Sequence, residues 1–167
     1  MNQAHFHLVV NHLPIIFPLV GILVLAIGII FGSEIVKRTS FFVFILGAIA
    51  TIFAMSSGEG AEEIAENIAG VTDQYIHEHE EKAEVFALLS YILGAFSLIG
   101  LWASWKKKGF STIVSYLVLT LSLVVIFFGK QTGTTGGEIR HTEIRANQSA
   151  GNTSDAGETQ ESEDEDE

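Results

Sequence analysis

Four long stretches without a charged side chain constrain this chain more than any other feature. No Asp, Glu, Lys or Arg occurs from Met1 to Ser33, and further uncharged stretches cover residues 39–58, 85–105 and 109–129. Each is 20 residues or longer, and about 20 apolar residues form an α-helix that crosses a ~30 Å hydrocarbon core. These stretches are apolar on every side, whereas a core helix of a soluble protein carries a polar stripe. The sequence therefore predicts an all-α fold, a bundle of four transmembrane helices.

The charged residues between these stretches set the limits of the predicted helices. The first stretch lacks the basic start and the small-residue cleavage site of a signal peptide, so we expect it to be retained as a helix. Within a transmembrane domain of residues 1–145, we predict spans at about 8–32, 40–57, 85–105 and 109–129. In the polar segment 58–84, the sequence predicts a helix from Ala61 to Ala69, a stop at Gly70, and a helix capped by Thr72 or Asp73 that continues into the third span.

Residues 146–167 form a predicted disordered acidic tail. From Asn147 onward the chain has eight acids, no base and no large apolar side chain, so it cannot bury enough surface to offset the entropy lost on ordering. Without these acids the net charge is −3 rather than −11, which argues against a nucleic-acid partner. The absence of cysteine excludes disulfides, zinc ribbons and iron–sulfur clusters held by thiolates.

Basic residues in short turns predict the orientation of the helices. Lys37 and Arg38 follow the first span, and Lys106, Lys107 and Lys108 follow the third. Lys and Arg in short loops resist translocation, so both turns are expected in the cytoplasm. The N-terminus, the segment 58–84 and the C-terminus then share the opposite side of the membrane.

Histidines are the main candidates for cofactor binding, and in this topology all of them lie on the non-cytoplasmic side: His5, His7, His12, His77, His79 and His141. His12 lies inside an uncharged stretch, where a polar ring needs a partner. His5 and His12 are seven residues apart and would share a helical face if the first helix begins that early. His79 lies on the apolar stripe that enters the third span, whereas His77 aligns with acidic residues and is expected to face solvent.

A b-type haem requires two histidines from facing helices at a similar depth. His12 paired with His79 or His141 could supply them, and His77 is a further candidate. The alternative is that His12 forms a hydrogen bond with a neighbouring helix end or an interfacial water. The sequence leaves both interpretations open.

Carboxylates provide a second candidate site. Glu59, Glu63 and Glu66 follow i, i+4, i+7 spacing on one helical face, and a divalent-metal site could combine His5, His7, Glu59 and Glu63. The Glu-x-x-His spacing typical of carboxylate-bridged metal bundles is absent, so a hydrated acidic face is the competing interpretation. No nucleophile–base motif, phosphate loop or dinucleotide fingerprint occurs, and we predict no catalytic residues.

Three short motifs carry a resemblance: Asn11-His12-Leu13-Pro14-Ile15, a histidine at position 77 or 79, and Thr132-Gly133-Thr134-Thr135-Gly136-Gly137. Over about residues 5–141 they resemble an uncharacterised family of small four-helix bacterial membrane proteins, with a His-x-Pro opening and a terminal Gly-Gly. This chain has His5-Phe6-His7 where the family has a His-Pro pair, which puts the exact ligand assignment in doubt. Because such proteins occur alongside cytochrome domains, the resemblance implies a bacterial inner membrane and a respiratory or cytochrome partner.

Three hypotheses about function follow. The leading one is a membrane protein that binds b-type haem through periplasmic histidines and serves electron transfer. The second is a cofactor-free accessory or structural subunit of a larger membrane complex. The third is a periplasmic divalent-metal-binding protein.

Overall fold

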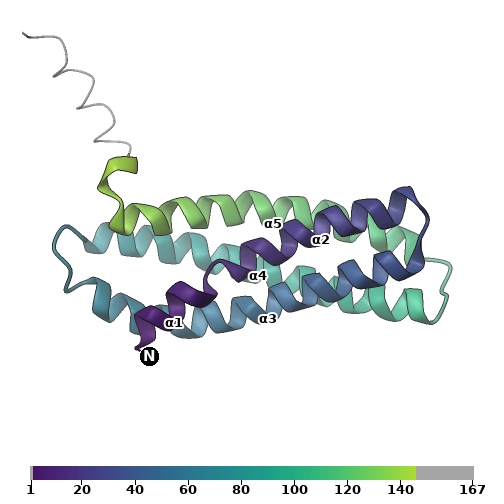
Figure 1. The fold of residues 1–167 in the computed structure, drawn as a ribbon, viewed down its shortest axis with the longest axis horizontal. Coiled ribbons are helices and arrows are strands. Elements are labelled where there is room, and N and C mark those ends of the chain that lie inside the picture. The colour runs from purple at the N-terminus through teal and green to yellow at the C-terminus, as the bar shows by residue number, and fades with distance from the viewer. Residues whose placement is uncertain (1, 146–167) are drawn as a thin grey trace, which may run out of the picture.

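The computed structural model describes residues 2–145, and the predicted acidic tail 146–167 lies outside this range. Within it the chain is helical throughout, which confirms the predicted all-α class (Figure 1). The helices are α1 (Gln3–Val10), α2 (Leu13–Ile30), α3 (Glu34–Ala65), α4 (Asp73–Trp105), α5 (Ser111–Arg140) and the short 3₁₀ helix η1 (Thr142–Ile144).

Four helical segments are long and apolar enough to cross a membrane: Gln3–Ile30, α3, α4 and α5. Helix α2 packs on α3, α3 on α4, α4 on α5, and α5 returns to α2, so the bundle closes on itself. Large apolar side chains remain exposed around it, for example Leu23, Ile113 and Phe127. Such an outer surface is unfavourable in water and suits contact with lipid.

Small buried residues hold the helices close together. In α5, Ser115, Ser122 and Gly129 recur every seven residues and are buried, which is the spacing of a helix–helix seam. In α4 a Cβ atom on Gly94 would lie 2.6 Å from the Cβ of Ala48 in α3. Close approach of this kind requires glycine, because helices in lipid associate through backbone proximity and van der Waals packing.

The predicted continuous first helix is wrong, because the chain breaks at Asn11–His12 and separates α1 from α2. Pro14 lies in the first turn of α2 and has no N–H to donate to the carbonyl of Val10 in the preceding turn. The expectation that His5 and His12 share one helical face fails for the same reason. Helix α1 instead packs on α3.

The polar segment 58–84 is more regular than predicted. Helix α3 continues without a break to Ala65 rather than giving way to a separate helix over 61–69. A turn follows in which Gly70 has φ +84°, a conformation that favours glycine, and Thr72 occupies the N-cap position of α4. The helix thus ends at Ala65 rather than at the predicted stop, Gly70, and Thr72 occupies the predicted N-cap position without a capping hydrogen bond from its side chain.

Helix α5 also exceeds its predicted end, since it runs through the Gly/Thr-rich stretch to Arg140. The hydroxyls of Thr132 and Thr134 donate to the carbonyls of Phe128 and Lys130, four residues earlier, at 3.1 and 3.0 Å. These bonds satisfy the threonine side chains inside the helix. The extension brings Thr135 and Gly136 beside α4.

Candidate histidine site

The two ends of the bundle have different polar groups. The turns after α2 and α4 lie at one end, on the right in Figure 1, and carry the basic residues of the chain's short turns. The N-terminal residues, the α3–α4 turn and the C-terminal end of α5 lie at the other end. All six histidines belong to this second end, which we call the histidine end.

His7 in α1 is half-buried against α3. Its Nδ1 atom lies 3.1 Å from the carbonyl oxygen of Ala54 and 3.0 Å from Oγ of Ser57. The Ser57 hydroxyl is itself within reach of the carbonyls of Phe53 and Ala54, at 2.9 and 3.0 Å. The Ala54 carbonyl can only accept, so the Nδ1–H group must donate to it. The neutral ring then carries its lone pair on Nε2.

His79 in α4 has the same arrangement on the other side of the site. Its Nδ1 atom lies 3.2 Å from Oγ1 of Thr135 in α5. The Thr135 hydroxyl is also within reach of the carbonyls of Thr132 and Gln131, at 3.1 and 3.3 Å; when it donates to one of them, it accepts a hydrogen bond from His79 Nδ1–H. His79 Nε2 is left with a free lone pair, and no hydrogen bond to it occurs within residues 2–145.

Gly136 provides the space that His79 occupies. A Cβ atom at this position would lie 2.9 Å from His79 Cε1 and 3.2 Å from Nδ1. Both distances are shorter than ordinary van der Waals contact, so any side chain here would displace the imidazole. The predicted Gly-Gly motif therefore has a structural role beside the histidine.

Ala54 of α3 is the common neighbour of the site. Its carbonyl accepts the hydrogen bond from His7, and it lines two cavities together with His79. The smaller cavity, of about 90 Å³, is also lined by His12. The structure thus gathers three histidines around one level of α3.

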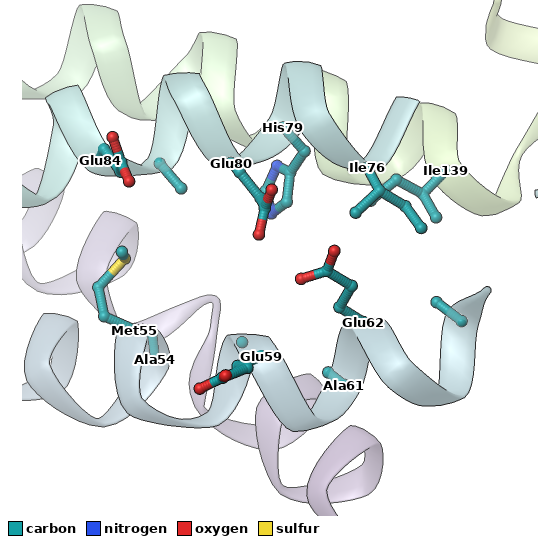
Figure 2. A pocket seen from close by; sticks show the side chains of 13 residues that line it. Ala54, Met55, Glu59, Ala61, Glu62, Ile76, His79, Glu80, Glu84 and Ile139 are labelled. Atoms are coloured by element: carbon teal, nitrogen blue, oxygen red, sulfur yellow. The ribbon is translucent and has the colours of Figure 1, made fainter. Parts of the chain in front are cut away.

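The larger cavity, of about 250 Å³, lies between α3 and α4 (Figure 2). Its lining combines apolar side chains with His79 and four carboxylates, Glu59, Glu62, Glu80 and Glu84. Glu62 and Glu80 point toward one another from the two helices (Figure 2). In the smaller cavity Asn11 Oδ1 is buried and has no hydrogen-bond partner among the described residues.

Arg145 links the C-terminal end of α5 to the α3–α4 turn and to α4. It donates to the carbonyls of Glu138 and Ile139 at 2.8 and 3.0 Å, and to the carbonyl of Gly70 in the α3–α4 turn at 3.1 Å. Its guanidinium also lies 4.0 Å from the centre of the Tyr75 ring, a favourable cation–π geometry. These contacts fix the end of α5 against α4 and so hold Thr135 near His79.

The remaining predicted ligands lie further out. His141 is exposed and bonds to Glu143 at 2.9 Å, and the Glu143 backbone N–H and the His141 ring hold the pKa of Glu143 below its ordinary value. His77 is 75% exposed, with Glu81 3.4 Å away, which confirms its predicted solvent-facing position. His5 is exposed as well.

The predicted metal ligands are spread over this end. Glu59 lines the larger cavity, Glu63 is exposed, and His7 is occupied at Nδ1 by α3. In the part of the chain that the structure describes, no group of three or more His, Cys, Asp or Glu side chains is placed to hold a metal ion. The divalent-metal hypothesis therefore has no preformed site to support it.

Sequence reasoning placed His79 or His141 opposite His12 and assigned no haem role to His7. The break at Asn11 turns α1 onto α3 and so brings His7 to the site. A Pro14 two residues after His12 was the available signal for that break. The contributions of Ser57, Thr135 and Gly136 depend on helix packing and have no local signature.

No protein-family model, curated protein or solved structure matches this chain. The resemblance to a family of small bacterial membrane proteins stays a prediction. The geometry of the histidine end is thus the basis for assigning a function.

Proposed function

We propose that the chain is an integral protein of a bacterial inner membrane, with the histidine end in the periplasm. Four sufficiently long apolar helices and the exposed apolar surface support membrane insertion. The collection of Lys37, Arg38 and Lys106–Lys108 at the opposite end supports the orientation.

The chain has no cysteine, so single cysteines can report this topology. A thiol reagent that cannot cross the membrane should label Glu66→Cys in intact spheroplasts, because position 66 lies in the exposed α3–α4 turn. It should label Lys107→Cys only after the membrane is permeabilised. The reverse pattern would contradict the proposed orientation.

We further propose that the histidine end binds a b-type haem and that the protein serves electron transfer, with His7 and His79 as the axial ligands. The observation that carries this proposal is the shared state of the two rings. In each ring Nδ1 is the nitrogen within hydrogen-bond distance of the protein, so the Nδ1–H tautomer would leave the Nε2 lone pair free. An imidazole that binds a metal usually has its other nitrogen held in this way, and neutral imidazole is a ligand of haem iron.

The volume of the cavity beside His79 limits how a haem can bind there. The smaller cavity beside His79 measures about 90 Å³, whereas sites for ligands of drug size or larger span about 300–1,000 Å³. Binding of a haem therefore requires the space between α1 and α4 to widen. Helix α1 packs mainly on α3, where His7 bonds to Ala54, and is joined to α2 by two residues, Asn11 and His12, so the proposal requires this contact to be kept while the space opens toward α4.

The pair His12 and His79 is the alternative ligand set, because both rings line the smaller cavity. His12 is exposed, and its ring forms no hydrogen bond within residues 2–145. Nothing in the surroundings therefore fixes its tautomer, which makes it the weaker candidate.

An absorbance measurement tests the proposal. Protein expressed with ample haem and purified in mild detergent should show a Soret band and, in the reduced minus oxidised spectrum, an α band. A haem content near one per chain is expected. A haem-free protein that is well folded by circular dichroism would overturn the haem proposal and favour the accessory-subunit or metal-binding hypotheses.

A further inference from the structure

The larger cavity differs from an ordinary surface hollow because part of its wall belongs to the apolar, membrane-spanning part of the helices. It begins at Ala54 and Met55, inside the uncharged stretch 39–58, and at Ala83 just before the stretch 85–105. From there it extends to the carboxylates of Glu62 and Glu80. In a bilayer the cavity would therefore cross the boundary between hydrocarbon and water.

The walls of this cavity are chemically divided. The apolar part is formed by short or flexible side chains: Met55, Ala61, Ala65, Ile76, Ala83 and Ile139. The polar part consists of the carboxylates of Glu59, Glu62, Glu80 and Glu84 and the edge of the His79 ring. Glu62 and Glu80 approach one another from opposite helices (Figure 2). Glu62 is half-buried while Glu80 is exposed, so Glu62 is the carboxylate placed to bind a group inside the cavity.

We infer that this cavity binds the ring of a membrane hydroquinone. A dry cavity of about 150 Å³ accommodates benzene, so a cavity of about 250 Å³ accommodates a substituted aromatic ring. The ring hydroxyls are donors, and carboxylates accept hydrogen bonds from hydroxyls at short range. The alkyl tail of such a molecule lies in lipid, which agrees with a cavity that begins at the depth of the apolar spans.

This inference rests on the proposed function for its membrane location, and it names the class of redox partner for the proposed haem. Binding of the hydroquinone itself requires no haem, because the cavity is formed by side chains of α3, α4 and α5. The binding measurement can therefore fail while the haem spectrum is present, or succeed while it is absent.

The experiment measures binding of a decyl-substituted hydroquinone, kept reduced, to the purified full-length protein in detergent. The wild type should bind it saturably at one site per chain. Ala65→Leu places a larger side chain in the cavity and should weaken binding at least about tenfold. Glu62→Gln removes a charged acceptor and should weaken binding about tenfold. The matched controls are Ala95→Leu and Glu63→Gln, both at exposed positions outside the cavity, and both should bind as the wild type does.

Circular dichroism and gel filtration of each variant establish that it folds, and Glu62→Gln keeps the test decisive if Ala65→Leu does not. The absence of saturable binding to the wild type would overturn the inference. So would unchanged affinity in both cavity variants. Saturable binding of tetraphenylphosphonium instead, lost in Glu62→Gln, would also overturn it by identifying a site for lipophilic cations.

Discussion

The two ends of the bundle differ in how fully their polar side chains are hydrogen-bonded. At the basic end, Arg38 donates to Oγ and to the carbonyl of Ser104, both at 2.9 Å, and the Ser104 hydroxyl donates to Glu34 at 2.6 Å. Lys37, which is 6% exposed, forms an ion pair with Glu34. Each of these charged groups has a partner, and together they tie the start of α3 to the end of α4.

At the histidine end, several polar side chains use only part of their hydrogen-bonding capacity. His7 and His79 each use one nitrogen, Asn11 Oδ1 has no partner within the described residues, and two cavities adjoin His79. A buried polar group without a partner costs free energy, so an arrangement of this kind is expected where a ligand completes it. We infer that the basic end stabilises the fold and that the histidine end binds the cofactor.

The largest expected effect comes from the axial histidines themselves. His7→Ala and His79→Ala should each remove one ligand of the iron and reduce the haem content of the purified protein to a small fraction of that in the wild type. His77→Ala and His141→Ala should leave it unchanged, since both rings are exposed and lie beside exposed carboxylates, Glu81 and Glu143. Haem per chain is measured by the pyridine haemochrome assay. Equal loss of haem in all four variants would contradict the assignment of His7 and His79 as the ligands.

A single methyl group near His79 should have the next largest effect. Gly136→Ala places a Cβ atom 2.9 Å from the imidazole and should weaken haem binding about 100-fold, near the upper limit for changes that displace a ligand. Gly133→Ala is the control for a methyl group elsewhere on the wall of the smaller cavity, because its Cβ would meet Ile15, at 3.5 Å, and not the His79 ring. Alanine favours helix over glycine, so neither change should unfold α5. Haem titration of the apoprotein provides the two affinities, and equal values would contradict the role of Gly136.

Loss of the acceptor for His79 should have a smaller effect. Thr135→Val keeps the shape of the side chain and removes the hydroxyl 3.2 Å from Nδ1. Haem affinity should fall about tenfold, as is typical when a hydrogen bond to a ligating histidine is lost, and the midpoint potential should shift. Thr134→Val is the control, since its hydroxyl bonds only to its own helix. A potential unchanged from the wild type would show that Thr135 does not position His79.

Changes at the basic end should have the smallest effect on haem binding. They should lower the stability of the fold instead. Glu34→Gln weakens the contacts with Lys37 and Ser104 and should lower the free energy of unfolding by about 1–2 kcal/mol. Haem affinity should not change. Unfolding in mixed detergent micelles gives the first quantity and haem titration the second, with Glu63→Gln as the exposed control. A loss of haem in Glu34→Gln with unaltered stability would reverse the proposed roles of the two ends.

Much of the fold could be predicted from the sequence because lipid-compatible helices require long uncharged stretches, and these are visible residue by residue. The turn at Gly70 and the position of His79 on an apolar stripe followed from equally local patterns. The proposed pairing of His7 with His79 could not be predicted, since it depends on how α1 is placed relative to α2 by the break at Asn11 and His12. The hydrogen bonds that fix the two tautomers join residues 47 and 56 positions apart, and such contacts arise only from packing.

The length of α5 is a second feature that could not be predicted from the local sequence. The glycines and threonines after Gly129 predict a helix end by propensity, yet the structure continues the helix for more than two turns to Arg140. Threonine hydroxyls bond back to the helix, and Arg145 binds carbonyls near its end. Packing against α4 thus outweighs local preference, and Thr135 and Gly136 reach His79 as a result.

The ligand pair can be identified most directly by electron paramagnetic resonance of the oxidised protein. With His7 and His79 both bound, the wild type should give a low-spin signal characteristic of two imidazole ligands. Any haem retained by His7→Ala should become high-spin, while His12→Ala keeps the low-spin signal. A low-spin signal that survives in His7→Ala and disappears in His12→Ala would assign the second ligand to His12 and contradict the proposed pair.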